Sequence, residues 1–139
     1  MVVGVWQMIG IDTNVLVRFL VDDDLKQNAV ARAFMAKRTA DDPAYLSAIA
    51  LAETVWVLHR RLSYPMPIIF DMLRALLSTD AFIIENMEEL DALINGEDEP
   101  RGDLADHLIA WSCARAGCQQ VATFDRKASL SVPAMELLQ

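Results

Sequence analysis

An apolar run that ends in a single acid, at residues 8–16, constrains the fold of this chain more than any other stretch. Apolar residues lead to Asp12, two small polar residues follow at Thr13 and Asn14, and apolar residues return with helical spacing from Val15 onward. This pattern predicts a buried strand, a turn and then a helix. In an open α/β sheet the carboxyl ends of the strands face the ligand crevice, so we expect Asp12 to point into a functional cleft.

Length and charge limit the classes of protein to consider. A chain of 139 residues is long enough for one domain that buries about two thirds of its unfolded surface. The net charge is -8, from 20 acidic and 12 basic residues. This balance argues against a protein that binds nucleic acid by neutralising phosphates alone. It leaves open an enzyme whose carboxylates hold metal ions, because bound cations reverse the local charge.

The cysteines and the hydropathy favour a cytoplasmic protein. Cys113 and Cys118 form no CxxC pair and have no histidine pair nearby, so we expect reduced thiols. Residues 1–7 are apolar but lack the basic start and the cleavage pattern of a signal peptide. No stretch approaches the roughly 20 apolar residues that span a bilayer. We interpret residues 1–7 as an N-terminal extension, leaving open a non-native start, and residues 8–139 as a single domain.

Predicted strands alternate with predicted helices along the rest of the chain. We expect helices over residues 25–37, 48–62, 68–77, 86–94 and 103–116, and strands over residues 44–46, 81–84, 121–124 and 132–138. The helix over residues 25–37 is expected to bury Ala29, Val30, Ala33 and Phe34. Alternation of this kind implies right-handed crossovers and a mainly parallel sheet. We therefore predict a three-layer α/β/α domain with a central sheet of four to five strands.

Four further acids stand where functional side chains are expected. Glu53 lies among apolar neighbours early in a predicted helix, which is hard to explain by a solvated face, although a surface or capping role is the alternative. Asp103 and Asp106 are three residues apart and so share a helix face. Asp125 directly follows an apolar strand. These carboxylates come from separate segments that can meet at one edge of a parallel sheet.

Carboxylates gathered in one cleft repel each other, and each is driven to protonate unless a cation compensates its charge. Oxygen ligands without cysteine or paired histidine suit Mg²⁺ or Mn²⁺ better than zinc. Such ions activate water and stabilise the leaving oxygen of a phosphodiester. We therefore predict metal-dependent phosphodiester hydrolysis. The expected metal ligands are Asp12, Glu53, Asp103, Asp106 and Asp125.

Four segments, in this order and spacing, resemble the successive motifs of the PIN domain family, and in particular those of the VapC-type toxins of type II toxin–antitoxin pairs. They are IDTNVL at residues 11–16, SAIALAETVWV at 47–57, DLADHLIA at 103–110 and VATFDR at 121–126. The resemblance covers nearly the whole chain from Met8. It implies a PIN-like fold and a ribonuclease that depends on Mg²⁺ or Mn²⁺. It also implies a homodimer and silencing by a cognate VapB antitoxin.

The resemblance assigns a role to each of the acids. Asp12, Glu53 and Asp106 match the three principal acidic positions of the family. Asp125 matches the fourth, more variable acid, and Asp103 is an auxiliary ligand. The small polar residues that match positions orienting the acids through hydrogen bonds are Thr13, Asn14, Ser47 and Thr123.

Several other side chains invite a functional interpretation. Four basic residues could contact the phosphates of RNA, or they could instead be solvated or form salt bridges. They are Arg60, Arg61, Arg126 and Lys127. His107 lies about 100° round the helix from Asp106 and is not expected to be a catalytic base. Core or dimer packing, rather than stacking on bases, is expected for Trp6, Trp56 and Trp111.

Two other functions compete with the ribonuclease. An aspartyl phosphotransferase or phosphatase would use Asp12 as a nucleophile, but Asn14 stands where it needs a second acid, and no lysine follows a later strand. A non-catalytic PIN-like binding module is opposed by the complete set of acids, since a decayed site should have lost at least one. If a VapB-like partner exists, we expect its tail to place an Arg or Lys among these carboxylates.

Overall fold

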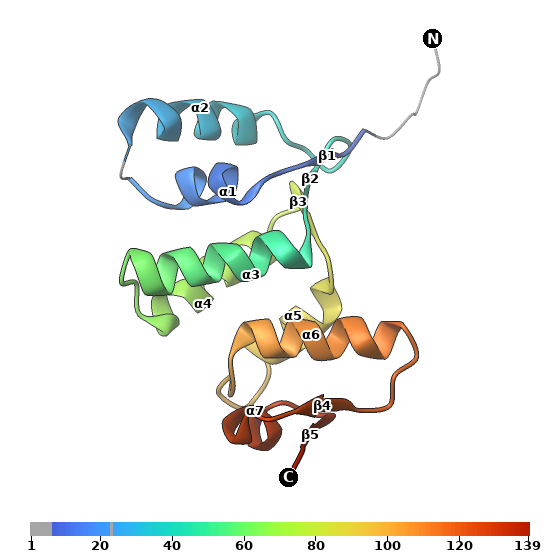
Figure 1. Ribbon diagram of the computed structural model, residues 1–139. Coiled ribbons are helices and arrows are strands. Elements are labelled where there is room, and N and C mark those ends of the chain that lie inside the picture. The colour runs from blue at the N-terminus through green and yellow to red at the C-terminus, as the bar shows by residue number, and fades with distance from the viewer. Residues whose placement is uncertain (1–6, 23) are drawn as a thin grey trace. The chain divides into compact units, whose positions relative to one another are not determined.

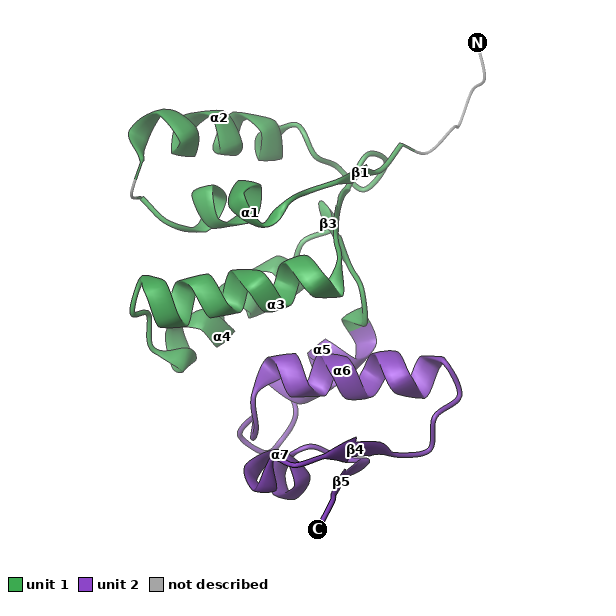
Figure 2. Ribbon diagram, viewed as in Figure 1, with its two compact units in different colours: residues 1–87 green, residues 88–139 purple. Residues whose placement is uncertain are grey.

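The computed structural model describes residues 7–22 and 24–139 of the chain (Figure 1). The chain divides into two compact units, unit 1 over residues 1–87 and unit 2 over residues 88–139 (Figure 2). The predicted N-terminal extension, except for Gln7, and the side chain of Trp6 lie outside the described residues. The interpretation of residues 8–139 as a single domain stays a prediction.

The described residues of unit 1 form a parallel sheet and four α-helices. Its elements are β1 (Ile9–Gly10), α1 (Thr13–Leu20), α2 (Leu25–Ala36), β2 (Ala44–Leu46), α3 (Ala48–Trp56), the π-helical turn η1 (Val57–Arg61), α4 (Met66–Leu77) and β3 (Phe82–Ile84). The sheet has the order β1-β2-β3, with Ala44 opposite both Ile9 and Phe82. The expected helix over residues 48–62 is therefore continuous, but its last part is π-helical rather than α-helical.

The core of unit 1 consists of aliphatic side chains from its helices and the central strand. The side chains of Leu16, Leu46, Leu51, Leu58 and Ile69 are fully buried. Helix α1 packs against both α2 and α3, and α4 packs against β3 and η1. Because each fully buried leucine contributes about 1.5–3 kcal/mol, this core fixes the chain segments that follow β1 and β2.

Helix α2 buries a different face from the one that its apolar residues predict. Its buried residues are Asn28, Ala31 and Met35, whereas Val30 is 71% exposed. The side-chain amide of Asn28 donates to the carbonyls of Arg18 and Val21 near the end of α1, and its Oδ1 accepts from the backbone N–H of Asp24 at 2.8 Å. The predicted burial of Ala29, Val30 and Ala33 was wrong, because the hydrogen bonds of a buried asparagine set the rotation of α2, and Phe34 is only half-buried.

Unit 2 contains three helices and a pair of parallel strands. Its elements are α5 (Met87–Ile94), which begins at the last residue of unit 1, α6 (Leu104–Arg115), β4 (Val121–Thr123), α7 (Arg126–Ser131) and β5 (Met135–Leu137). Strand β4 pairs with β5 in parallel, with Val121 opposite Met135. Helix α7 was not predicted from the sequence. It supplies the short crossover that two parallel neighbours require.

The predicted α/β class with parallel strands is confirmed. Among the residues that the structure describes, all strand pairs are parallel, and the strands form a three-stranded sheet in unit 1 and a two-stranded sheet in unit 2. Helices come between successive strands, as the alternating pattern predicted. Over the described part of the chain, no helix combines the length and the apolar character needed to cross a membrane.

Candidate functional site

Thr13 joins the two candidate acids of unit 1. Asp12 follows β1 and is the N-cap of α1, where its Oδ1 accepts a hydrogen bond from the backbone N–H of Thr13 at 2.8 Å. The Thr13 hydroxyl in turn donates to Oε2 of Glu53 at 3.0 Å. Thr13 is only 7% exposed, while both carboxylates are exposed. A single buried residue therefore orients both acids, one through its backbone and one through its side chain.

Two acceptors at the N-terminus of α3 hold the helix that carries Glu53. Ser47 is the N-cap and accepts from the backbone N–H of Ala50 at 3.1 Å. Glu85 accepts from the backbone N–H of Ala48 at 3.0 Å. Both acceptors satisfy amide groups that have no partner within the helix. The Ser47 hydroxyl thus caps the helix, and its effect on Glu53 is through the position of α3.

Glu85 was missed by the sequence analysis. It directly follows β3, which is the same arrangement that drew attention to Asp12 after β1. Its backbone N–H donates to the carbonyl of Leu46 at 2.9 Å, so it extends the pairing of β3 with β2. The sequence signal that could have identified Glu85 is its position directly after the apolar run at residues 81–84.

The π-helical turn η1 ends in three basic side chains. Leu58 anchors the turn in the core, and Nδ1 of His59 lies 2.9 Å from the carbonyl oxygen of Tyr64. Arg60 and Arg61 are exposed, and neither forms a salt bridge with another described residue. A salt bridge to another described residue therefore does not explain these two arginines. Single π-helical turns occur frequently at functional sites.

Unit 2 brings the other three candidate acids near one another. Asp103 is the N-cap of α6 and accepts from the backbone N–H of Ala105 at 3.0 Å, while Asp106 lies in the first turn of the same helix. Asp125 follows β4 and is the N-cap of α7, accepting from the backbone N–H of Ala128 at 3.1 Å. Capping therefore accounts for part of the role of Asp103 and Asp125.

Burial and the repulsion among the three carboxylates of this cluster raise the pKa of Asp106. Partial burial raises that pKa above its ordinary value of 3.8, and the negative charges of Asp103 and Asp125 raise it further, while His107 opposes the shift. Three carboxylates are thus close enough for their charges to interact. A cation placed among them would relieve this repulsion, whereas without one the charge of Asp106 is disfavoured.

Two of the predicted orienting residues have different surroundings. The hydroxyl of Thr123 accepts from the backbone N–H of Asp125 at 3.0 Å, which fixes the turn between β4 and α7. Asn14 is exposed next to Asp12, and its side chain forms no hydrogen bond with any residue that the structure describes.

His107 and the tryptophans have structural surroundings that can be stated directly. His107 is buried, its Nε2 lies 2.5 Å from the carbonyl oxygen of Arg101, and its ring packs on Trp111 with centroids 5.8 Å apart. It thus holds the segment before α6. Trp56 is 57% exposed, because it lies on the exposed face of α3 that also carries Glu53. Packing of Trp56 in the core was therefore a wrong prediction, and its packing in a dimer stays a prediction.

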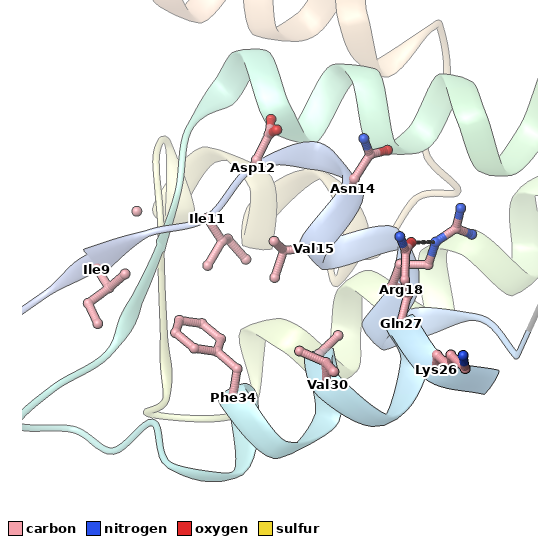
Figure 3. Close-up of a pocket in the computed structure, with 12 residues that line it drawn as sticks. Ile9, Ile11, Asp12, Asn14, Val15, Arg18, Lys26, Gln27, Val30 and Phe34 are labelled. Atoms are coloured by element: carbon pink, nitrogen blue, oxygen red, sulfur yellow. Dashed lines mark hydrogen bonds between the residues drawn. The ribbon is translucent and has the colours of Figure 1, made fainter. Parts of the chain in front are cut away.

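An apolar groove of about 680 Å³ opens beside Asp12, between β1, α1 and α2 (Figure 3). Its apolar walls come from Ile9, Ile11, Val15, Val30 and Phe34. Asp12 and Asn14 lie at one margin, and Arg18, Lys26 and Gln27 lie at the other. The rotation of α2 creates this groove, because it leaves Val30 unburied.

A family model described as PIN domain matches residues 9–130 of the chain. The chain belongs to the PIN domain family. PIN domains are generally metal-dependent nucleases, so this PIN domain is assigned at that level to the nucleases, a class of hydrolases. No curated protein and no solved structure matches the chain. The predicted family is confirmed, and the narrower placement among VapC-type toxins stays a prediction.

The candidate ligands of this PIN domain fit a divalent cation by their chemistry. Among residues 7–22 and 24–139, no three Asp, Glu, His or Cys side chains are close enough together to hold a metal ion. The predicted ligands are divided, with Asp12 and Glu53 in unit 1 and the three aspartates in unit 2. All of them offer carboxylate oxygens, the donors that Mg²⁺ and Mn²⁺ prefer. The repulsion felt by Asp106 is the kind of strain that such an ion relieves.

Proposed function

We propose that this PIN domain is an endoribonuclease of the VapC toxin type, which hydrolyses phosphodiester bonds of RNA with Mg²⁺ or Mn²⁺. The observation that carries the proposal is the buried Thr13, which orients the carboxylates of Asp12 and Glu53 together. A buried residue that bonds one exposed acid through its backbone N–H and a second, 40 residues further along the chain, through its hydroxyl is hard to explain by capping alone.

We assign the catalytic acids to Asp12, Glu53, Asp106 and Asp125, with Asp103 as an auxiliary metal ligand. When bound, Mg²⁺ or Mn²⁺ supplies a Lewis acid and lowers the pKa of water. Within the protein, the Thr13 hydroxyl holds the Glu53 carboxylate in one orientation. The backbone N–H of Asp125 is held by Thr123, which keeps the turn after β4 in place.

The unpaired basic residues support RNA as the substrate despite the negative net charge. Arg60 and Arg61 follow the helix of Glu53, and Arg126 and Lys127 follow Asp125. None of the four forms a salt bridge with the residues that the structure describes. We propose that they contact phosphates of the RNA, since such contacts position a nucleic acid without reading its sequence.

The apolar groove beside Asp12 supports a protein partner of the VapB-like antitoxin type. A groove walled by two helices is suited to an amphipathic helix of a partner. A segment seated there would begin next to Asp12, from where an Arg or Lys side chain can form charge-assisted hydrogen bonds with the carboxylates. We propose this as the route of inhibition. The proposed homodimer rests on the family resemblance and is tested by the mass of the protein in solution.

The deciding experiment is cleavage of total cellular RNA by the purified protein with Mn²⁺ and with EDTA. Asp12→Asn and Asp106→Asn are compared with the wild type, one acid from each unit. We expect cleavage that needs the metal and that falls by at least about a hundredfold in both variants. Cleavage that survives either substitution would contradict the proposal. No cleavage of any RNA would favour the non-catalytic binding module, and a phosphorylated Asp12 would favour the phosphotransferase.

A further inference from the structure

Two aromatic side chains are exposed while the others are wholly or partly buried. Among the Phe, Tyr and Trp residues in the described ranges 7–22 and 24–139, only Trp56 and Phe124 are exposed, at 57% and 84%. Exposing a large aromatic surface to water is unfavourable, by about 25 cal/mol for each Å². Both rings therefore gain free energy when a ligand or a partner covers them.

Each exposed aromatic lies beside a candidate acid. Trp56 follows Glu53 by three residues within α3, so both side chains lie on the same helix face. Phe124 directly precedes Asp125 in the turn between β4 and α7. The two units thus repeat one arrangement, in which an aromatic ring accompanies a carboxylate.

Each aromatic is also followed by two adjacent basic residues. Arg60 and Arg61 lie in η1, directly after the helix of Trp56, and Arg126 and Lys127 begin α7, directly after Phe124 and Asp125. None of these four forms a salt bridge within the described part of the chain.

The third adjacent pair of basic residues in the chain, Lys37 and Arg38, differs. Arg38 bonds to Asp42 at 3.2 Å, and its guanidinium lies 4.4 Å from the centre of the Phe34 ring. Of the three adjacent basic pairs, this is the one with a member that is held by an acid and by an aromatic ring among the described residues.

Both aromatics are presented from ordered backbone. Thr123, which precedes Phe124, has its carbonyl bonded to the backbone N–H of Leu138 at 2.8 Å and its hydroxyl bonded to the backbone N–H of Asp125. Trp56 ends α3 between the buried Val55 and the half-buried Val57. A ring on a fixed backbone has only its side-chain torsions left to order when a ligand covers it.

We propose that Trp56 and Phe124 are stacking platforms for unpaired bases of the RNA substrate, one beside Glu53 and one beside Asp125. The basic residues that follow each ring bind phosphates of the same strand. This inference rests on the proposed ribonuclease function and adds residues that hold the substrate. Stacking on an aromatic ring tolerates every base, but it requires a base that is free from its own duplex. The platforms therefore select single-stranded segments.

The test is the affinity for a single-stranded oligoribonucleotide of about 12 nucleotides, measured by fluorescence anisotropy in the Asp106→Asn background with Mg²⁺. Trp56→Leu and Phe124→Leu keep an apolar side chain but remove the ring. We expect each to weaken binding by at least about fivefold. Trp56→Phe and Phe124→Trp should retain most of the affinity. Leu130→Ala is the matched control, because Leu130 is 75% exposed in the same unit as Phe124 and has no acid beside it in sequence.

A second oligonucleotide of the same length, in which abasic nucleotides replace the bases, separates stacking from other effects. The leucine variants should bind this abasic strand as well as the proteins with intact rings do. Equal losses for the normal and the abasic strand, or no loss for either, would overturn the inference. A changed oligomeric state with unchanged RNA affinity would instead assign the rings to a protein contact.

These results are distinguishable from a failure of the proposed function. A wild type that cleaves RNA while both leucine variants cleave and bind equally well would remove only the platforms. A wild type that binds the strand through the rings but cleaves no RNA would keep the platforms and remove the ribonuclease.

Discussion

Replacing Thr13 by valine removes the hydroxyl that joins the first acid motif to Glu53 while keeping the volume of the side chain. The hydroxyl donates to Oε2 of Glu53 at 3.0 Å from a nearly buried position. The backbone N–H of residue 13 remains and continues to bond Asp12. The variant therefore releases Glu53 and leaves Asp12 held, which isolates the contribution of one hydrogen bond.

The size of the effect follows from the environment of the bond. A hydrogen bond to a charged group contributes about 1.5–3 kcal/mol, but Glu53 is exposed and water replaces part of the lost bond. We therefore expect the stability to change by no more than about 1 kcal/mol. The loss of orientation should be larger in function, because removing a residue that orients a metal ligand costs about 10- to 100-fold in metal affinity or activity.

The assay is single-turnover cleavage of an RNA substrate over a range of Mn²⁺ concentrations, together with thermal unfolding in EDTA. Thr13→Val should need more Mn²⁺ for half-maximal cleavage or should cleave about tenfold more slowly at saturation. Thr13→Ser, which keeps the hydroxyl, should behave nearly as the wild type.

The matched control is Thr54→Val, one residue beyond Glu53 on the same helix. The Thr54 hydroxyl is fully buried, but it bonds the carbonyl of Ala50 at 2.7 Å and not an acid. Its loss should leave cleavage unchanged. The reasoning would be refuted if Thr13→Val cleaved as fast as the wild type at every Mn²⁺ concentration, or if Thr54→Val lost as much activity.

Three further predictions test the electrostatics and the groove. Because the pKa of Asp106 is raised above 3.8 in the folded protein, the folded chain binds this proton more tightly, and the free energy of unfolding falls as the pH rises past that value. Asp106→Asn should therefore raise the melting temperature, measured by calorimetry at neutral pH in EDTA, and should abolish cleavage in the presence of Mn²⁺. A lower melting temperature of the variant would contradict this prediction. Replacing both Arg60 and Arg61 by glutamine should reduce the slope of log affinity against log salt by about 0.7 per lost contact, measured on a single-stranded oligoribonucleotide, and an unchanged slope would mean that they do not contact phosphates. Val30→Glu should leave cleavage unaltered but prevent inhibition by a VapB-like partner. The test is to add that partner to the variant and to the wild type and to measure cleavage. Equally strong inhibition of both proteins would exclude the groove as the docking site.

Local patterns predicted most elements of this chain because they depend on neighbours in sequence. The strand, turn and helix around Asp12 appear at the expected place. The strand was predicted to be buried, and this was wrong, because Ile9 and Gly10 of the edge strand β1 are exposed. The acids at the ends of β1 and β4 were likewise visible, since an acid after an apolar run is a local signal. Glu85 has the same signal after β3 and was nevertheless overlooked.

The buried face of α2 was predicted wrongly for a tertiary reason. Apolar spacing favoured Val30 and Phe34, but the hydrogen bonds of Asn28 with the carbonyls of α1 decide the rotation of the helix. A polar side chain can be buried when its hydrogen-bond partners lie on another helix or strand. The spacing of residues along one helix does not show where those partners are.

The sequence by itself therefore determined the α/β class, the family and the acids that define the candidate site, because these depend on residue type, order and local period. Only the tertiary structure decided which side chains meet. The bond between Thr13 and Glu53 joins residues 40 positions apart, and the exposure of Trp56 depends on which neighbours pack against α3. Such contacts depend on how separate elements pack in three dimensions, which no local pattern encodes.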